Sequence, residues 1–327
     1  MPLARFSKLI TSRNQGGGDK KQGFPPSMGL GTFAMNAIRI RAWGYLRDTI
    51  IPPTTFSATI TTPSNSFTLR MPYDAVDSRG IYDGTIYWGD GTTSPNVKNA
   101  EHIYLLAGNY TITIDGVING WYTYSNGTMY QCLITINRFG PKFSFGTFAS
   151  DTNGAGGMFR NCSLLKTISS DIPTSNVKTM VFMFNGCANF NQELDFNTSN
   201  VVFMGSMFNG CTNFNSTLKF NDTSKVENMS YMFYGCTKFN KPLDFNTSKV
   251  LNMQAMFTGC AKFNQPLPFD TSLVTYMDYM FSGCSIFSQN LSGWCVEDIA
   301  SLPLGFNTNA PGLTVSNLPK WGEVCTP

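Results

Sequence analysis

The fold is decided by residues 199–220, whose sequence is SNVVFMGSMFNGCTNFNSTLKF. Its first half spaces apolar residues three or four apart, at Val201, Met204, Met207, Phe208 and Cys211. This spacing predicts a short helix, with Thr198 or Ser199 as the N-cap and Gly210 near the end. In the second half, Leu218, Lys219 and Phe220 alternate apolar and polar side chains. That alternation predicts a short strand whose lysine faces solvent.

The same pattern recurs along the chain with a period of 24 or 25 residues. Each unit has a single cysteine preceded by a Met-Phe pair, at Cys162, Cys187, Cys211, Cys236, Cys260 and Cys284. Four units repeat the strand pattern, as FNQELDF, FNSTLKF, FNKPLDF and FNQPLPF. Repeats of this length stack so that each buries its apolar side chains against its neighbours. We therefore expect a parallel sheet on one face of the stack and short helices on the other.

The recurring cysteines could indicate a metal site or a structural column. Zinc ligands arrive as close pairs, whereas these cysteines come singly, so we expect buried thiols, no metal and no cofactor. Disulfides between adjacent units are an alternative that the sequence does not decide, because they depend on the distance between Cα atoms. Cys295 and Cys325 lie beyond the repeats and would close a 30-residue loop. They are a candidate disulfide.

The segment ahead of the repeats is predicted to be a β-domain. Residues 85–88 and 109–114 are rich in Thr, Ile and Tyr and predict two strands, with a tight Gly-Asp-Gly turn at residues 89–91. Asp90 could bind calcium, but no second carboxylate lies near it in the sequence, and a turn residue is the preferred interpretation. His102 is interpreted as a packed strand residue.

Both regions resemble known families. The pattern C-x-x-F-N-x-x-L-x-F-x-T-S-x-V-x-x-M-x-x-M-F-x-G-C, over about residues 155–295, resembles the BspA-like leucine-rich repeats of mycoplasma surface proteins. The residues WGDGTT at 88–93, His102 to Tyr104 and GNYTIT at 108–113 resemble a PKD module.

The two resemblances imply a chain that is mostly β with short helices. A PKD/immunoglobulin-like β-sandwich would precede a leucine-rich-repeat-type α/β solenoid with a C-terminal cap. The expected divisions are an extended arm at 1–50, the sandwich at 51–140, the solenoid at 141–294 and the cap at 295–327.

Composition argues against several classes of function. Charged residues make up only 13% of the chain, the net charge is +3, and there is one histidine. A single histidine argues against histidine-based catalytic triads and cannot form a multi-histidine metal site. Neither a Walker loop nor a G-x-S-x-G or H-E-x-x-H motif occurs. No run of 18 apolar residues occurs, so membrane insertion is not expected. The expectation is a structural or binding protein that is not an enzyme and binds no specific nucleic acid.

The first 50 residues form a basic arm with a net charge of +6. Its stretch NQGGGDKKQGFPPSMG, at residues 14–29, resembles N-terminal segments of virion proteins of large DNA viruses of algae and protists. The resemblance implies a minor capsid or capsid-surface protein in the virion, anchored by the arm to the major capsid protein and other minor capsid proteins. The candidate anchoring residues are Arg5, Lys8, Arg13, Lys20, Lys21, Arg39, Arg41 and Arg47.

Other interpretations stay open. One alternative is that the arm is simply solvated. Another is that the protein is a cell-surface adhesin that binds a host protein or glycan, the role that BspA-like repeats imply. For either function the outward strand positions Asp195, Lys219, Asp244 and Pro268 are the candidate contact face of the solenoid.

Overall fold

The computed structural model describes residues 55–73, 80–123, 127–146 and 156–325. The chain divides into two units, residues 1–50 and 51–327. The predicted arm and its eight basic residues lie outside the described residues. The described chain is mostly β, as predicted. Its helices are two three-residue 3-10 turns, η1 (Met129–Gln131) and η3 (Val315–Asn317).

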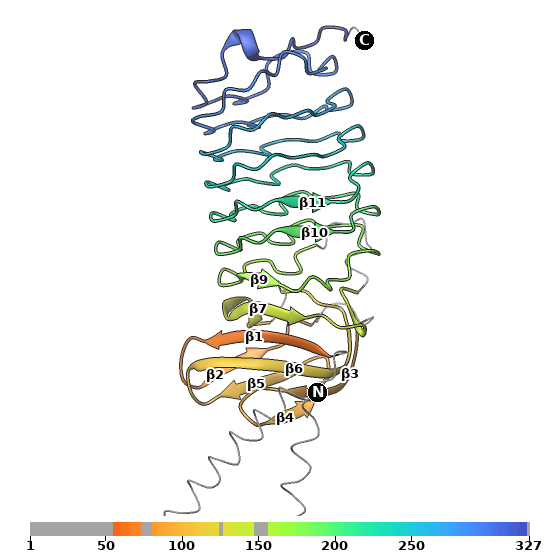
Figure 1. The fold of residues 1–327 in the computed structure, drawn as a ribbon, viewed down its shortest axis with the longest axis vertical. Coiled ribbons are helices and arrows are strands. Elements are labelled where there is room, and N and C mark those ends of the chain that lie inside the picture. Colours follow the sequence, from red (N-terminus) through yellow and green to blue (C-terminus); the bar gives the residue numbers. More distant parts are fainter. Residues whose placement is uncertain (1–54, 74–79, 124–126, 147–155, 326–327) are drawn as a thin grey trace, which may run out of the picture. The chain divides into compact units, whose positions relative to one another are not determined.

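Two sheets surround one core in the first part of the described chain. The larger sheet has the strand order β4, β3, β6, β1, β7, β9, and β8 pairs with β6 (Figure 1). Its strands are β1 (Phe56–Thr62), β3 (Ile81–Tyr87), β4 (Thr93–Pro95), β6 (Gly108–Asn119), β7 (Leu133–Arg138), β8 (Phe143–Ser144) and β9 (Thr167–Ile168). The smaller sheet pairs β2 (Phe67–Arg70) with β5 (Glu101–Tyr104). Alternate residues of β1 and β6, among them Ile60 and Ile112, share a buried core with Leu69 and Tyr104 of the smaller sheet.

The large sheet continues into the repeat region through β9. Strand β9 pairs in parallel with β7, so that Ile168 lies opposite Ile136. On the other side of β9, Gln192 acts as a substitute strand. Its side-chain amide accepts the Ile168 N–H at 2.7 Å and donates to the Ile168 carbonyl at 2.8 Å. The predicted boundary at residue 140 therefore separates two regions that share one sheet.

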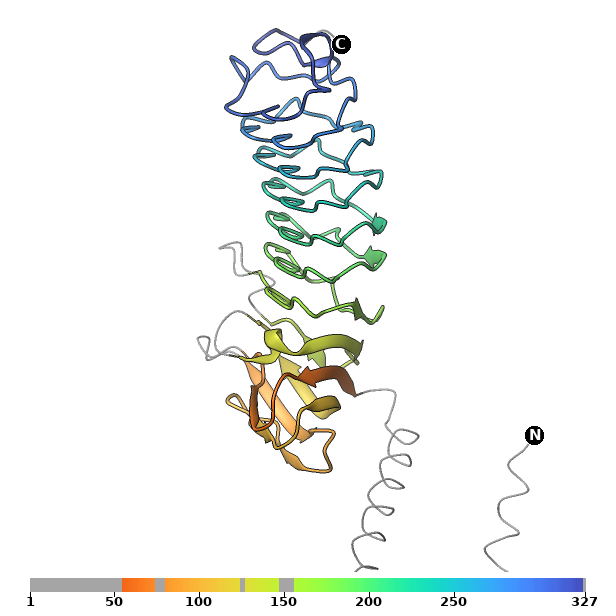
Figure 2. The same ribbon diagram turned by 90° about the vertical axis from the view of Figure 1, so that its left-hand side faces the viewer.

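Beyond β9 the chain forms coils that lie one above another (Figures 1 and 2). Parallel bridges connect equivalent residues of successive coils, in the order Thr179, Phe203, Asn228, Asn252 and Tyr276. Successive backbone N–H groups donate alternately to a carbonyl of the next coil and to a carbonyl of their own coil. The Phe184 N–H donates to the Met207 carbonyl of the next coil at 2.8 Å, whereas the Cys187 N–H donates to the Phe184 carbonyl of its own coil at 2.9 Å. Alternate amides thus join a coil to the next and fix the register of the stack.

The helix predicted for residues 199–210 is wrong. This segment forms consecutive turns, in which the Met207 N–H donates to the Met204 carbonyl at 3.2 Å, and Ser206 has a φ of 56°. A left-handed residue cannot continue a right-handed helix, so the turns cannot merge into one. The apolar spacing nevertheless predicted the buried side chains correctly, because turns of three residues bring the same positions inward. These are Val201, Met204, Met207, Phe208 and Cys211.

Thr198, predicted as a possible helix cap, connects two coils instead. Its hydroxyl donates to the Asp222 carbonyl of the next coil at 2.5 Å, and the hydroxyl of Thr271 donates to the Cys295 carbonyl at 2.7 Å. In four of the coils the serine that follows the threonine bonds to an Asn or Asp two residues earlier, at Ser199, Ser224, Ser248 and Ser272. Ser199, for example, donates through its hydroxyl to Asn197 Oδ1 at 2.8 Å.

Two of the four predicted repeat strands are present. Strands β10 (Leu194–Phe196) and β11 (Leu218–Phe220) pair in parallel, with Asp195 opposite Lys219. The equivalent segments 243–245 and 267–269 bury their Leu and Phe side chains but are not strands. Prolines occur beside or within both segments, at Pro242, Pro266 and Pro268. A proline lacks the N–H that a strand ladder requires, which explains the difference.

Aromatic ladders fill the interior of the stack. One runs through Phe184, Phe208, Phe233, Phe257 and Phe281, with ring centroids 5.6 to 5.7 Å apart between neighbouring coils. A second ladder runs from Phe190 to Phe287. Within each coil its ring packs against the first ladder, with ring centroids 4.3 to 4.5 Å apart. Stacked rings at these distances add about 0.5–1.5 kcal/mol per pair beyond the area they bury.

The predicted cap begins with one further coil. The Phe281 N–H donates to the Phe306 carbonyl and the Gly283 N–H to the Thr308 carbonyl, both at 2.8 Å, so the ladder of coils continues. Ala310 occupies the place that cysteine has in the other coils. Trp321 then packs edge-on against Phe306, with ring centroids 5.1 Å apart. The final coil is therefore covered by an aromatic side chain from the C-terminal tail.

Candidate binding face

One surface of the stack differs from the others in its backbone and side chains. We call it the turn face and define it as residues 179–185, 203–209, 228–234, 252–258 and 276–282. Its second half contains the consecutive turns described above. Aromatic side chains that are not fully buried gather here, among them Tyr234, Tyr276 and Tyr279, which are 41%, 59% and 40% exposed. Elsewhere in the described coils, the partly exposed Phe220 and Trp321 pack against the core.

The turn face contains a column of left-handed residues, one in each coil. These are Phe182, Ser206, Tyr231, Ala255 and Tyr279, with φ between 53° and 58°. Glycine takes the equivalent place at both ends of the stack, at Gly157 and Gly305. A bulky residue in this conformation is a genuine outlier, because its Cβ crowds the following carbonyl. Large rings at alternate coils therefore occupy positions where glycine would be easiest to accommodate.

A shallow groove of about 410 Å³ lies on the turn face across three coils. Its middle coil contributes Gly205 and Ser206, which are buried, and the flanking coils contribute the half-exposed rings of Phe182 and Tyr231. The remaining lining residues are Val181, Phe203, Asn209, Asn228 and Ser230.

The groove is lined by polar and apolar side chains and carries no charge. Asn228 Oδ1 accepts the N–H and the hydroxyl of Ser230, at 2.9 and 2.7 Å. The oxygen is thus engaged, and the amide NH₂ of Asn228 is the part that can donate to a ligand. Among the described residues that line the groove there is no Asp, Glu, Lys, Arg or His. At its edge, the guanidinium of Arg160 lies 4.5 Å from the ring centroid of Phe182.

The predicted contact face lies on a different part of the coils. Asp195, Lys219, Asp244 and Pro268 are all exposed and occupy equivalent positions in successive coils. Lys219 Nζ forms an ion pair with Glu193 Oε1 at 2.5 Å, which raises the pKa of Lys219. The signs along this column are mixed and one charge is already paired, so the predicted face lacks a distinctive chemistry.

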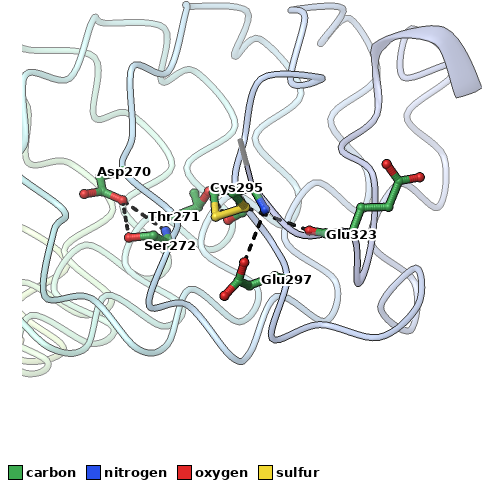
Figure 3. Close-up of a disulfide and its surroundings, with 7 residues drawn as sticks. Asp270, Thr271, Ser272, Cys295, Glu297 and Glu323 are labelled. Carbon is green, nitrogen blue, oxygen red and sulfur yellow. Dashed lines mark hydrogen bonds between the residues drawn. A yellow bond between two sulfur atoms is a disulfide. The ribbon is translucent and has the colours of Figure 1, made fainter. Parts of the chain in front are cut away.

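Cys295 and Cys325, the candidate disulfide, are bonded to each other, with their Cα atoms 5.6 Å apart (Figure 3). Glu297 lies beside the bond and accepts the Cys325 N–H at 3.2 Å. These three residues are close enough to suggest a metal site. However, sulfurs joined in a disulfide are not thiolates and cannot serve as metal ligands. Cys295, Glu297 and Cys325 are better explained as a structural contact that attaches the C-terminal tail to the coil before it.

His102 and Asp90 meet in the β-domain. His102 Nε2 lies 2.7 Å from Asp90 Oδ2, and its ring stacks on Trp88 at 4.9 Å. Burial raises the pKa of Asp90, but hydrogen bonds from Thr92 and His102 outweigh burial and hold it below its ordinary value. Asp90 Oδ1 also accepts the Thr92 N–H at 3.0 Å, as in a tight turn. Both carboxylate oxygens thus have partners, Thr92 in the turn and His102 on β5.

The sequence predictions missed the turn face. The signal was present, because the residue before each Met-Phe pair alternates between aromatic and small, at Phe182, Ser206, Tyr231, Ala255 and Tyr279. The apolar stripe of the predicted helix did not include these positions. Only the backbone reveals that they are left-handed.

Stacked short coils with internal ladders define the second part of this chain as a repeat protein. Residues 154–267 and 243–311 match a family described as "Mycoplasma protein of unknown function, DUF285". The match fits the resemblance to BspA-like repeats drawn from the sequence. No curated protein and no solved structure matches the chain significantly. Within the described part of the chain, no helix has the length and apolar character to span a membrane.

Proposed function

We propose that this chain is a non-enzymatic binding protein that contacts its partner through the turn face. The observation that carries the proposal is the left-handed column, where Phe182, Tyr231 and Tyr279 hold large rings. Such a conformation costs about 1–3 kcal/mol per residue and tends to persist where it serves a function. Aromatic residues are also enriched at protein interfaces and supply much of their binding energy. A contact made by these rings would offset their strain.

The proposal extends to the identity of the two regions. The coils are proposed to be a leucine-rich-repeat-type solenoid of the BspA-like kind, supported by the family match over residues 154–311. The β-domain is proposed to be PKD-like and immunoglobulin-like, supported by two sheets around one core and by the buried Trp88 ahead of the Gly-Asp-Gly turn.

The proposed setting is the virion of a large DNA virus. There the protein would be a minor capsid or capsid-surface protein, with the basic arm 1–50 anchored among capsid proteins and the coils in contact with a neighbour. The support is the charge of the arm and the resemblance of its residues 14–29 to virion proteins. A second candidate is a cell-surface adhesin for a host protein or glycan, favoured by the match to a mycoplasma family.

Mass spectrometry of purified virus particles from the source of the sequence separates the two settings. Detection of the protein in the particles would support the virion. Its absence there, together with labelling by surface biotinylation of intact cells, would support the adhesin.

The role of the turn face is tested by a triple variant, Phe182→Gly, Tyr231→Gly and Tyr279→Gly. Glycine accepts the left-handed backbone without strain, so the coils should remain folded while the rings are lost. We expect retention on the particle or cell to fall at least tenfold. The matched control, Asp195→Ala, Lys219→Ala and Asp244→Ala, changes the other face and should retain binding. Equal retention of both variants would contradict the proposal.

A further inference from the structure

We propose that the C-terminal contact, once its disulfide is reduced, binds a zinc ion through Cys295, Glu297 and Cys325. The inference goes beyond the proposed function, because it concerns a different part of the molecule. The two sulfurs and a carboxylate oxygen of Glu297 all lie within 4.8 Å of one another. The sulfurs are joined in the structure, so the zinc site exists only after reduction.

The spacing of the three groups is close to what a zinc ion requires. Zinc binds thiolate sulfur at about 2.3 Å and carboxylate oxygen at about 2.1 Å, in a tetrahedral arrangement. Ligand atoms in such a site therefore lie roughly 3.5–3.8 Å apart. The reduced sulfurs must separate, and the carboxylate oxygen must approach them by about 1 Å at most. Two thiolates and a carboxylate would then occupy three positions of the zinc ion, and water the fourth.

The local chain already directs Glu297 toward the two cysteines. Cys295 and Glu297 flank Val296, which is buried, whereas Cys295 is half-buried and Glu297 is exposed. Their side chains therefore point away from the core that Val296 enters. Glu297 Oε2 accepts the Cys325 N–H at 3.2 Å (Figure 3), and Glu297 Oε1 has no partner among the described residues. A carboxylate oxygen is thus available beside the sulfurs.

The tail that carries Cys325 is held near the coil by contacts besides the disulfide. The Gly322 N–H donates to the Val296 carbonyl at 3.2 Å, and Trp321 packs against the last coil. Residues 322–324, between these contacts and Cys325, are exposed. The two sulfurs should therefore stay close together after reduction, while the exposed residues allow Cys325 to shift into a zinc-binding position.

Reduction and zinc binding are two separate steps. A dithiol reductant transfers two electrons and two protons to the disulfide, which gives two thiols, and the dithiol is itself oxidised to a disulfide. Zinc then displaces the two thiol protons and binds both thiolates. Cys295 and Cys325 are partly exposed, whereas the seven free cysteines are buried. A reductant or a metal ion can therefore reach this pair and not the others.

The site would keep the tail attached in either redox environment. Disulfides persist in oxidising compartments, whereas thiols are kept reduced in the cytosol. Under oxidising conditions the disulfide joins Cys325 to Cys295, and under reducing conditions the zinc ion would join the same two residues. The end of the stack would thus stay covered in both.

The test is titration of the reduced full chain with Co²⁺, which replaces zinc in tetrahedral sites and absorbs light when thiolates bind it. The chain is reduced with a dithiol, freed of the dithiol by gel filtration without oxygen, and checked by circular dichroism. We expect cobalt–thiolate absorption that saturates at one equivalent of Co²⁺ and disappears when Zn²⁺ is added. The unreduced parent is the control and should show no such absorption.

Variants identify the ligands. Glu297→Gln should weaken Zn²⁺ binding to the reduced chain at least tenfold, because an amide is a poorer zinc ligand than a carboxylate. Asp298→Asn changes the neighbouring exposed acidic residue and should leave Zn²⁺ binding unchanged. Cys325→Ser removes one thiolate and should abolish the saturable cobalt absorption. Zn²⁺ should also raise the thermal midpoint of the reduced parent, and raise it less in Glu297→Gln.

Three results would overturn the inference. One is the absence of cobalt–thiolate absorption in a reduced chain whose circular dichroism matches that of the parent. The second is equal Zn²⁺ affinity of Glu297→Gln and Asp298→Asn. The third is loss of the coil structure on reduction alone, because the three ligands would then no longer lie together.

Discussion

At the scale of single residues, five successive coils each bury a thiol that donates to the coil before it, at Cys187, Cys211, Cys236, Cys260 and Cys284. Cys236 Sγ donates to the Phe208 carbonyl at 3.1 Å, and Cys260 Sγ donates to the Phe233 carbonyl at 3.0 Å. Burial raises the pKa of both thiols and raises that of Cys284 to about 12. The thiols are therefore protonated at neutral pH and take part in packing and hydrogen bonding, not in redox chemistry.

Native protein should resist alkylation by iodoacetamide near neutral pH. The seven free cysteines are all buried, and only the thiolate reacts. Mass spectrometry should find them unlabelled in the folded chain and labelled after unfolding in guanidinium. Rapid labelling of Cys211 or Cys236 in the folded chain would contradict the buried column.

The glycines before the cysteines form a second left-handed column. Gly235 has a φ of 71°, and a Cβ added there would meet Gly210 Cα only at 3.9 Å, so space is available. Gly235→Ala should therefore destabilise the protein by about 1–2 kcal/mol through backbone strain alone. Gly235→Asn is the matched control and should cost less. Asn161 and Asn309 adopt the same conformation in the first and last coils. Urea denaturation of both variants measures the difference.

At the scale of elements, a carboxylate joins the β-domain to the first coil. Asp171 Oδ2 accepts the Gly140 N–H at 2.9 Å, and Asp171 Oδ1 accepts the Phe139 N–H at 3.0 Å. Burial raises the pKa of Asp171, but these bonds and one from Ser169 outweigh burial and hold it below its ordinary value. The contact thus contributes stability above the unfolded-state pKa, near 4, and loses it as pH falls through the lower folded value.

Acid should weaken the contact between Asp171 and the N–H groups of Phe139 and Gly140. The substitution Asp171→Asn should reduce this loss of stability in acid. We expect the free energy of unfolding of the parent, measured with urea, to fall as the pH is lowered from about 5 through the folded-state pKa of Asp171. The variant should be less stable near neutral pH and should fall less steeply in acid. Identical pH profiles would show that Asp171 does not carry the joint.

The sequence predicted the repeat period and the buried side chains of each coil, because apolar spacing records which positions face inward. It did not predict turns in place of a helix. The spacing of residues 201–211 suits both, and the left-handed conformation of Ser206 is not encoded by a glycine. Strand loss at residues 243–245 and 267–269 could have been predicted from Pro242 and Pro266. The groove required knowledge of which side chains share a surface, and that depends on the backbone.

At the scale of the whole second unit, the coils are interchangeable modules. Each coil hydrogen-bonds to the coils before and after it, so the stability of the stack should be close to a sum over neighbours. Deleting residues 237–260 removes one full period and joins Cys236 to Ala261, the residue equivalent to Thr237. The shortened chain should fold cooperatively with reduced stability, as followed by circular dichroism. Deleting residues 237–248 removes half a period, breaks the register and should abolish folding.

The central claim is that the turn face contacts the partner and the predicted contact face, at Asp195, Lys219, Asp244 and Pro268, does not. The most direct measurement places a photo-crosslinking residue at position 231 or, as the control, at position 219, in protein assembled in its native particle or cell. Both positions are accessible, so the comparison depends only on which surface is covered. The account predicts a crosslinked species from position 231 and none from position 219. A crosslink from position 219 alone would contradict it.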